Sequence, residues 1–438
     1  MKKIMMLLVA ALTLTSVVSA QTRVDVEGNK KKVAASDADI LNDKKNTKPA
    51  TWITRGNVYY NAVVAPTAAL YKGMADAQIK MLVGSPQEIK VEEVAGTVFD
   101  VWVYPHFDIY IVQGQNTLYS WKQKTFIVQN GLDVAFEAYN KAVELDSKQL
   151  DKVRGPVNKL IDQYKQEGDI AFSLADYKTA AHAFAKAYDF SVSPLVNAPD
   201  TLTGYNAGYV AILAEEFDNA LKYLKAINDL GYYGDPEGET YFLLYHAYNG
   251  KGDATAAENT LKEGVQKYPA NAKLIETLIL HYTTTGQDAS QMIPLVESAL
   301  QNDPNNFVFH FGLGMIYDKL GNFEKAAAEF QKATELNPDD FSSAFNLAIT
   351  YIRKAESMIE EVNAIPFNEK ARYDEKLAEL NSYYKKSLPI LQRAYELNPS
   401  EPSTVELMKN IYFRFRDESP EMMQNYDKYN ELLQSMQQ

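Results

Sequence analysis

The sequence predicts an all-α protein, a solenoid of stacked helix hairpins with a small β-rich insertion near its N-terminus. Two observations lead to this prediction. Small and bulky residues in the C-terminal half recur at helical spacing with a period of 34 residues, as between Pro304 and Pro338. Periods of this length are typical of helix-pair repeats. Residues 89–128, in contrast, are rich in β-branched and aromatic side chains, which favour strands.

The clearest repeat lies between these two prolines. Its small residues, Gly314 and Ala326, are expected where two antiparallel helices cross closely, and bulky residues fill the space between the helices. The same register continues on both sides of this repeat. The bulky and small residues that carry it are Tyr164, Gly168, Ala180, Phe184, Ala207, Gly208, Ala220, Leu224, Tyr241, Leu244, Ala257, Leu261, Ile275, Leu278, Tyr282, Leu313, Tyr317, Phe330, Ala344, Leu347, Tyr351, Leu391 and Ala394.

This pattern resembles the tetratricopeptide repeat (TPR) family, most closely over residues 130–416. The resemblance implies a right-handed superhelix of helix hairpins, and the period corresponds to about seven or eight repeats. Trp52, Gly56 and Tyr59 match the first helix of such a repeat near the N-terminus. The fold itself is compatible with many partners and does not specify one.

Two segments depart from the period. The β-rich stretch predicts an insertion of two to four strands. Near the C-terminus, Pro338 and Pro399 are 399 − 338 = 61 residues apart, which is 27 more than the period of 34. Apolar stripes on both sides of Pro366 predict a lengthened helical hairpin that packs on itself. The expected organisation is a signal peptide (1–20), a polar linker with one short helix around Asp37 (21–48), the first TPR-like helices (49–88), the β-rich insertion (89–128), the TPR array (129–416) with the extended hairpin (352–388), and a capping helix (417–438).

The first twenty residues predict where in the cell the protein is located. Lys2 and Lys3 precede a short apolar run that ends in small residues, which is the pattern of a secretory signal peptide cleaved after Ala20. The chain has no cysteine, so a disulfide framework, a thiolate metal site and a lipidated cysteine anchor are all excluded. We therefore expect a protein of the bacterial cell envelope, periplasmic or secreted, with no membrane span in the mature chain.

Catalytic and cofactor motifs are not found. Phosphate-binding loops, zinc-binding HExxH pairs and nucleophile elbows are missing from the sequence, and the five histidines are scattered singly. The formal net charge of −13 disfavours a nucleic-acid partner, whose phosphates would be repelled. We expect no metal, no cofactor and no enzymatic activity; the remaining place for a catalytic site is the β-rich insertion around His106.

A concave groove is the expected binding surface, because the resemblance implies that first helices line it. Carried over by register, the groove residues are aromatic or apolar in most repeats, which suits a protein or peptide partner of the cell envelope. The sequence thus predicts a non-catalytic scaffold or adaptor; the alternatives are a glycan-binding protein that uses the groove aromatics, and an enzyme with its site in the insertion. The predicted groove residues are Tyr205, Tyr209, Phe242, His246, Phe311, Met315, Phe345 and Ile349.

Overall fold

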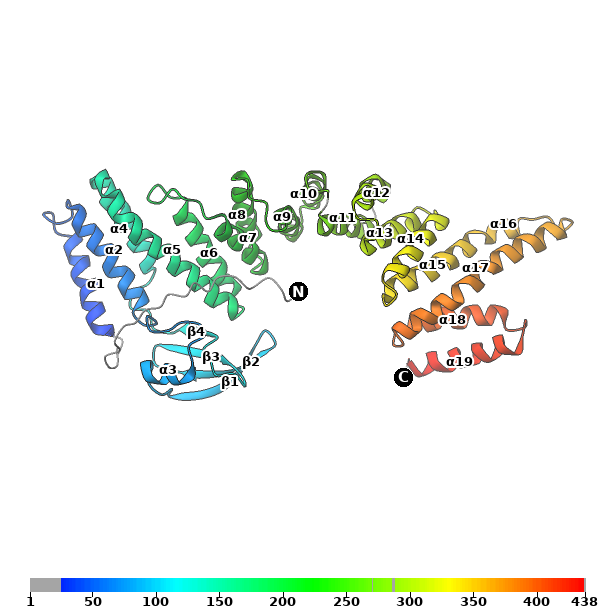
Figure 1. The fold of residues 1–438 in the computed structure, drawn as a ribbon, viewed down its shortest axis with the longest axis horizontal. Helices are drawn as coiled ribbons and strands as arrows, with labels where there is room; N and C mark the ends of the chain where they lie inside the picture. Colours follow the sequence, from blue (N-terminus) through cyan, green and yellow to red (C-terminus); the bar gives the residue numbers. More distant parts are fainter. Residues whose placement is uncertain (1–24, 270, 286–287, 437–438) are drawn as a thin grey trace. The chain divides into compact units, whose positions relative to one another are not determined.

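The structure is a computed structural model that describes residues 25–269, 271–285 and 288–436. The predicted signal peptide and its cleavage after Ala20 lie outside the described residues. The chain divides into two compact units, an N-terminal unit that ends at Tyr232 and a C-terminal unit that begins at Tyr233 (Figure 1). Among the described residues, every helix is too short or too polar to span a bilayer.

The N-terminal unit is built from helices that pack in pairs. Its main helices are α1 (Val26–Ile40), α2 (Pro49–Val64), α4 (Gly131–Leu145), α5 (Leu150–Ser173), α6 (Tyr177–Ser191), α7 (Thr201–Leu213) and α8 (Phe217–Asp229). The pairs α5–α6 and α7–α8 are sequential hairpins, but α2 packs on α4, and residues 65–130 lie between these two helices in the chain. The insertion therefore interrupts a hairpin between its first and second helix.

A close contact between α2 and α4 holds this interrupted hairpin together. Gly56 on α2 lies directly against the ring of Tyr139 on α4, so that a Cβ at position 56 would fall 2.3 Å from the Tyr139 Cε1 atom. Tyr139 is 1% exposed, and its hydroxyl donates a hydrogen bond to Asn57 Oδ1 at 2.8 Å. The contact joins residues 82 positions apart, which explains how the hairpin accommodates an insertion.

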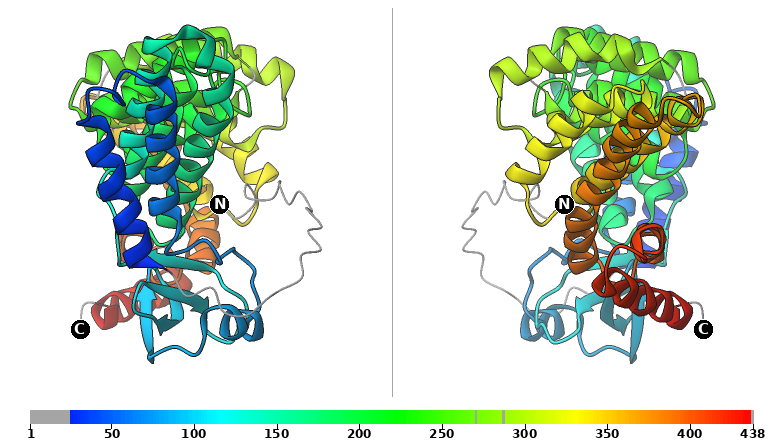
Figure 2. Two further views of the ribbon diagram at one scale, coloured as in Figure 1. Left: turned by 90° about the vertical axis from the view of Figure 1, so that its left-hand side faces the viewer. Right: turned by 90° about the vertical axis from the view of Figure 1, so that its right-hand side faces the viewer.

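The insertion is a four-stranded antiparallel sheet with one helix. It comprises α3 (Asp76–Val83), β1 (Glu88–Val94), β2 (Thr97–Val103), β3 (Phe107–Val112) and β4 (Ser120–Gln123), with the strands in the order β1-β2-β3-β4. Val94 pairs with Thr97 across a tight turn in which Ala95 and Gly96 both have positive φ. The sheet and α3 lie together at one end of the N-terminal helices (Figure 2). The prediction of a β-rich insertion is confirmed.

The helix α3 differs from the expected assignment. The sequence predicts TPR-like helices over residues 49–88, but α3 packs on the sheet, where Ile79 shares a buried cluster with Trp102, Ile109 and Trp121. Its eight residues are too few to cover a repeat, and their apolar side chains find a partner in the sheet instead.

The segment 26–40 forms the 15-residue helix α1, which is longer than the one short helix around Asp37 that the sequence predicts within a polar linker. The Asp25 carboxylate accepts a hydrogen bond from the Gly28 amide and caps the helix. Asp37 then pairs with Arg55 at 2.6 Å and accepts a hydrogen bond from the Tyr59 hydroxyl at 2.7 Å, both from α2. Val33 packs against the neighbouring core, and the other contacts that attach α1 are polar, so hydrophobic periodicity did not reveal the full length of the helix.

In its described residues, the C-terminal unit is a series of helices without an inserted sheet. They are α9 (Glu239–Gly250), α10 (Ala254–Lys267), α11 (Ala272–Thr285), α12 (Ile293–Asn302), α13 (Phe307–Lys319), α14 (Phe323–Leu336), α15 (Phe341–Ser357), α16 (Ile359–Asn363), α17 (Lys370–Leu397), α18 (Pro402–Phe415) and α19 (Pro420–Met436). In the α13–α14 hairpin, Gly314 lies against the ring of Phe330, which is 1% exposed. The small and bulky residues of the predicted repeat therefore meet at the crossing.

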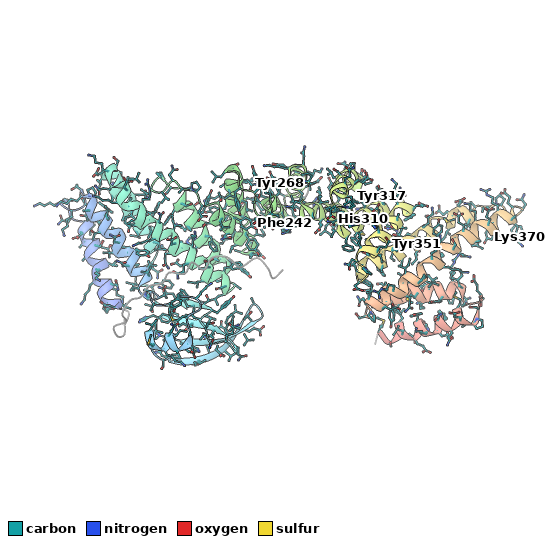
Figure 3. All side chains as sticks on the ribbon, in the orientation of Figure 1. Phe242, Tyr268, His310, Tyr317, Tyr351 and Lys370 are labelled. Atoms are coloured by element: carbon teal, nitrogen blue, oxygen red, sulfur yellow. The ribbon has the colours of Figure 1, made fainter. Side chains whose placement is uncertain are left out.

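The 27 additional residues lengthen the hairpin of α15 and α17, with the short helix α16 between them. Met358, Val362 and Leu380 are buried against one another in this part of the hairpin. The tip of the hairpin is exposed to solvent: Phe367 is fully exposed, and Lys370, the first residue of α17, lies at the tip (Figure 3).

The cap of α7 supports a prediction about stability. The Asp200 carboxylate accepts hydrogen bonds from the Thr203 amide at 3.0 Å and the Lys165 ammonium at 3.0 Å. Burial alone would raise the pKa of Asp200, but these hydrogen bonds together lower it below its usual value. We expect Asp200→Ala to lower the free energy of unfolding at pH 7 by about 1 kcal/mol.

The pH dependence has a definite sign. Because the pKa is lower in the folded chain, the stabilisation by Asp200 is present above the unfolded pKa of about 4 and is lost as the pH falls through the folded value. Thermal unfolding of wild type and Asp200→Ala at several pH values checks this. The two melting temperatures should converge in acid; a gap that stays constant down to about pH 2 would contradict the assignment.

Candidate partner-binding groove

All the predicted groove residues lie on first helices of hairpins, and none is fully buried. Tyr205 and Tyr209 lie on α7, Phe242 and His246 on α9, Phe311 and Met315 on α13, and Phe345 and Ile349 on α15. The first pair belongs to the N-terminal unit and the other three pairs belong to the C-terminal unit. We call them the α7 surface and the α9–α15 surface.

The α7 surface is a set of aromatic rings from α5, α7 and the loop after α8. Tyr205 and Tyr209, one turn apart, stack with ring centroids 6.4 Å apart. Phe172 on α5 lies 6.4 Å from Tyr209, and Tyr232 lies 6.2 Å from Tyr205. Tyr209 keeps 36% of its surface exposed, so its ring is accessible to a partner. The prediction omitted Phe172 and Tyr232.

The α9–α15 surface begins with Phe242 and His246 on α9, whose rings meet edge to face at 4.3 Å. The Lys273 ammonium on α11 lies 3.8 Å from the centre of the Phe242 ring and forms an ion pair with Glu239 at 2.6 Å. Figure 3 marks Phe242 on α9. The contacts with the Phe242 ring and with the Glu239 carboxylate stabilise the position of the Lys273 side chain.

Two further aromatic pairs follow on α13 and α15. Phe307 stacks on Phe311 with centroids 6.1 Å apart, and Phe341 stacks on Phe345 with centroids 5.3 Å apart. Phe307 and Phe341 are the first residues of their helices and were not predicted. Phe307 and Phe341 could have been predicted from the sequence, because each lies four residues before a predicted groove residue and residues four apart lie on one face of a helix.

Charges near these pairs are neutralised within the protein. Asp318 on α13 forms an ion pair with Arg353 on α15 and accepts a hydrogen bond from the Thr350 hydroxyl at 3.2 Å. Burial raises the pKa of Asp318, and Arg353 only partly opposes the rise. With Lys273 paired to Glu239 as well, the surface offers a partner mainly aromatic and apolar contacts.

Comparison with known proteins identifies the repeats. Two family models, both described as Tetratricopeptide repeat, match residues 307–340 and 329–362. The chain contains tetratricopeptide repeats. A TPR repeat-containing protein of Methanocaldococcus jannaschii is 27% identical over 217 residues, which are 49% of this chain and 31% of that protein. The antiviral innate immune response effector IFIT1 of Macaca fascicularis is 26% identical over 290 residues, 59% and 58% of the two chains. The TPR chain thus spans less than two thirds of each relative.

Solved structures with similar helices include YrrB, described as a TPR protein with an unusual peptide-binding site. It is 18% identical, with 52% of this chain and 98% of that chain covered and a TM-score of 0.35. A TPR repeats protein from Bacteroides fragilis NCTC 9343 is 19% identical, with 57% and 97% covered and a TM-score of 0.30.

The histidines of the TPR chain lie in separate environments. Tyr245 lies between His246 and His281, 5.1 Å from one ring and 5.8 Å from the other. His310 contacts Glu329 at 2.7 Å, and His106 in the insertion contacts the Thr125 hydroxyl at 3.0 Å. In residues 25–269, 271–285 and 288–436, no three acidic or histidine side chains cluster closely enough to hold a metal ion.

His246 supports a prediction about protonation. Burial lowers its pKa, and the positive charge of Lys273 lowers it further, so we expect an uncharged ring at pH 7. Because the unfolded chain takes up this proton more readily, the stabilisation by His246 is present above pH 6.5 and decreases as the pH falls. An NMR titration of the ring should give a midpoint below 6.5; a midpoint above this value would contradict the account.

Proposed function

We propose that this TPR protein is a non-catalytic scaffold or adaptor that binds another protein of the bacterial cell envelope. The observation that carries the proposal is the set of stacked aromatic pairs on first helices, Tyr205–Tyr209, Phe307–Phe311 and Phe341–Phe345. Partly exposed aromatic rings in rows are typical of the anchor residues of protein interfaces. The matching partner is a peptide or helix with apolar side chains at regular spacing.

The rings are held in place before any partner binds. Each stands on a helix whose N-terminus is capped, as by Asn306 before α13 and Asp340 before α15. Stacking on the ring one turn away further restricts side-chain rotation. Little conformational entropy is therefore lost on binding, which favours affinity at a modest contact area.

The proposed location is the periplasm, or beyond it after secretion. The basic and apolar leader with small residues before Gln21 supports export. Export places the interaction surfaces among envelope proteins.

Photo-cross-linking in intact cells tests the proposal. A benzoylphenylalanine is introduced at Tyr209 or Phe345, with Lys225 on α8 and Gln331 on α14 as exposed control positions on second helices. We expect the first two positions to capture one and the same protein, identified by mass spectrometry, and the controls to give no such product. Absence of a captured protein at both aromatic positions, or equal capture at the controls, would refute the scaffold.

A further inference from the structure

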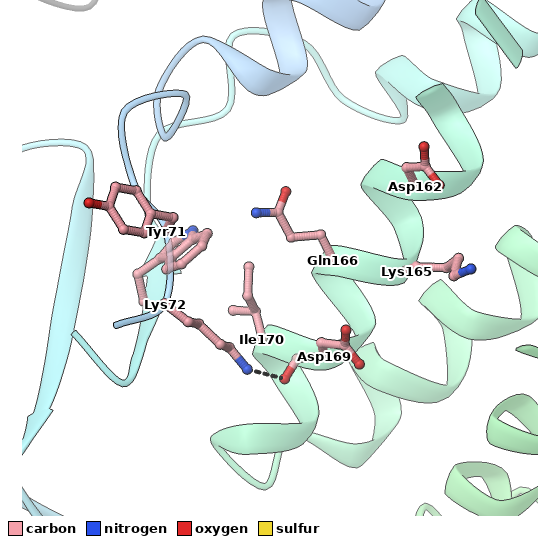
Figure 4. A pocket seen from close by; sticks show the side chains of 8 residues that line it. Tyr71, Lys72, Asp162, Lys165, Gln166, Asp169 and Ile170 are labelled. Atoms are coloured by element: carbon pink, nitrogen blue, oxygen red, sulfur yellow. Dashed lines mark hydrogen bonds between the residues drawn. The ribbon is translucent and has the colours of Figure 1, made fainter. Parts of the chain in front are cut away.

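A cavity of about 330 Å³ lies in the N-terminal unit, where the inserted sheet meets α5 (Figure 4). Its volume is at the lower end of the range for small-molecule sites, roughly 300–1,000 Å³. One wall is a single face of α5, since its residues are spaced by three and four positions. The lining residues are Tyr71, Lys72, Trp121, Asp162, Lys165, Gln166, Asp169 and Ile170.

The wall opposite α5 is aromatic. Trp121 on β4 is 4% exposed and forms part of the sheet core, and Tyr71, in the loop before α3, is 50% exposed. In Figure 4 the side chains of Gln166 and Ile170 extend from α5 toward the side of Tyr71. An amide and an apolar side chain thus lie across the cavity from an accessible ring.

The charges that line the cavity balance. The Lys72 ammonium donates hydrogen bonds to the Asp169 carbonyl oxygen at 3.1 Å and to the Ser173 hydroxyl at 3.3 Å, and Lys165 is paired with Asp200. Among the lining residues, Lys72 and Lys165 are matched in number by Asp162 and Asp169, and Asp200 lies outside the lining. Burial raises the pKa of Asp169 and lowers the pKa of Lys72, so the cavity disfavours charge of either sign.

Polar groups nevertheless remain available to a ligand. Within the described part of the chain, the side chains of Asp162, Gln166 and Asp169 make no hydrogen bond to another residue. Carboxylates accept hydrogen bonds, and the Gln166 amide both donates and accepts them. A ligand that fits must therefore be neutral, carry groups that donate and accept, and present an apolar face to Tyr71.

We propose that this cavity binds a neutral saccharide of one or two rings. Sugar hydroxyls donate to Asp162 and Asp169 and exchange hydrogen bonds with Gln166, while the C–H face of the ring packs on Tyr71. The site is separate from the α7 and α9–α15 surfaces, and its function does not depend on the scaffold role. The inserted sheet is necessary for it, because Tyr71, Lys72 and Trp121 come from the insertion.

Calorimetric titration of the purified full chain tests the proposal. The probes are glucose, N-acetylglucosamine, maltose and cellobiose, with choline and acetate as charged probes. We expect at least one of the four sugars to bind with one-to-one stoichiometry. Tyr71→Ala and Gln166→Ala, both at exposed positions, should each weaken that binding by about tenfold or more, the equivalent of one lost contact.

Two variants serve as matched controls. Asn158→Ala removes an exposed amide on α5 two turns before Gln166, outside the cavity, and Tyr373→Ala removes an exposed tyrosine from α17. Both should bind sugar like wild type. The proposal is overturned if none of the four sugars binds, if Tyr71→Ala and Gln166→Ala bind as tightly as wild type, or if choline or acetate binds more tightly than every sugar.

Discussion

Replacing Phe330 with alanine should lower the free energy of unfolding of the α13–α14 hairpin by about 3–5 kcal/mol. The Phe330 ring is 1% exposed and lies where Gly314 allows the two helices to approach, with Phe311 packed edge to face at 5.6 Å. Removal of the ring leaves a cavity that neighbouring helices cannot fill without moving. Folded domains are stable by only about 5–15 kcal/mol, so this loss is large.

Hydrogen exchange is the appropriate measurement, because repeat arrays do not always unfold in one step. The opening free energy of the α13 and α14 amides should fall in Phe330→Ala. Phe367→Ala is the matched control: this ring is fully exposed at the tip of the extended hairpin, and its removal should change stability by less than about 0.5 kcal/mol. Equal effects of the two variants would show that the crossing is not a core contact.

Gly56→Ala should destabilise the N-terminal unit by about 1–3 kcal/mol through overpacking. An alanine Cβ would lie 2.3 Å from the Tyr139 ring, which is 1% exposed and is held by its hydrogen bond to Asn57. Neither ring nor helix can move away without breaking a buried contact. Because α2 and α4 enclose the insertion, the sheet should lose protection together with this hairpin.

Thermal unfolding monitored by circular dichroism measures this effect. Asn61→Ala places the same residue at an exposed position on α2 and should leave the melting temperature nearly unchanged. A Gly56→Ala protein as stable as wild type would mean that α2 and α4 do not form the hairpin described.

The fold class was predictable where residues at equivalent positions of successive repeats have the same local packing. In the C-terminal unit, tyrosines recur at spacings of 34 or 35 residues, at Tyr248, Tyr282, Tyr317 and Tyr351, so the period is read directly from the sequence. The position of the insertion inside a hairpin was not predictable in this way. The contact of Gly56 with Tyr139 joins distant segments, and no local pattern reports such a pairing.

The candidate sites were predictable to different degrees. Register placed Tyr209 and Phe345 on first helices, where both are partly exposed, but it could not select Phe172, which reaches the α7 surface from the preceding hairpin. The cavity near Tyr71 was missed altogether. It forms between a loop and a helix about ninety residues apart, and its charged and amide side chains are unremarkable in the sequence.

The affinity of the captured partner for two variants tests the central claim, that the aromatic pairs bind it. By calorimetry, Phe345→Ala should weaken binding by about tenfold or more, as expected for an interface anchor, whereas Phe367→Ala should leave the dissociation constant unchanged. Circular dichroism confirms that both variants are folded. Equal affinity of wild type and Phe345→Ala would contradict the account.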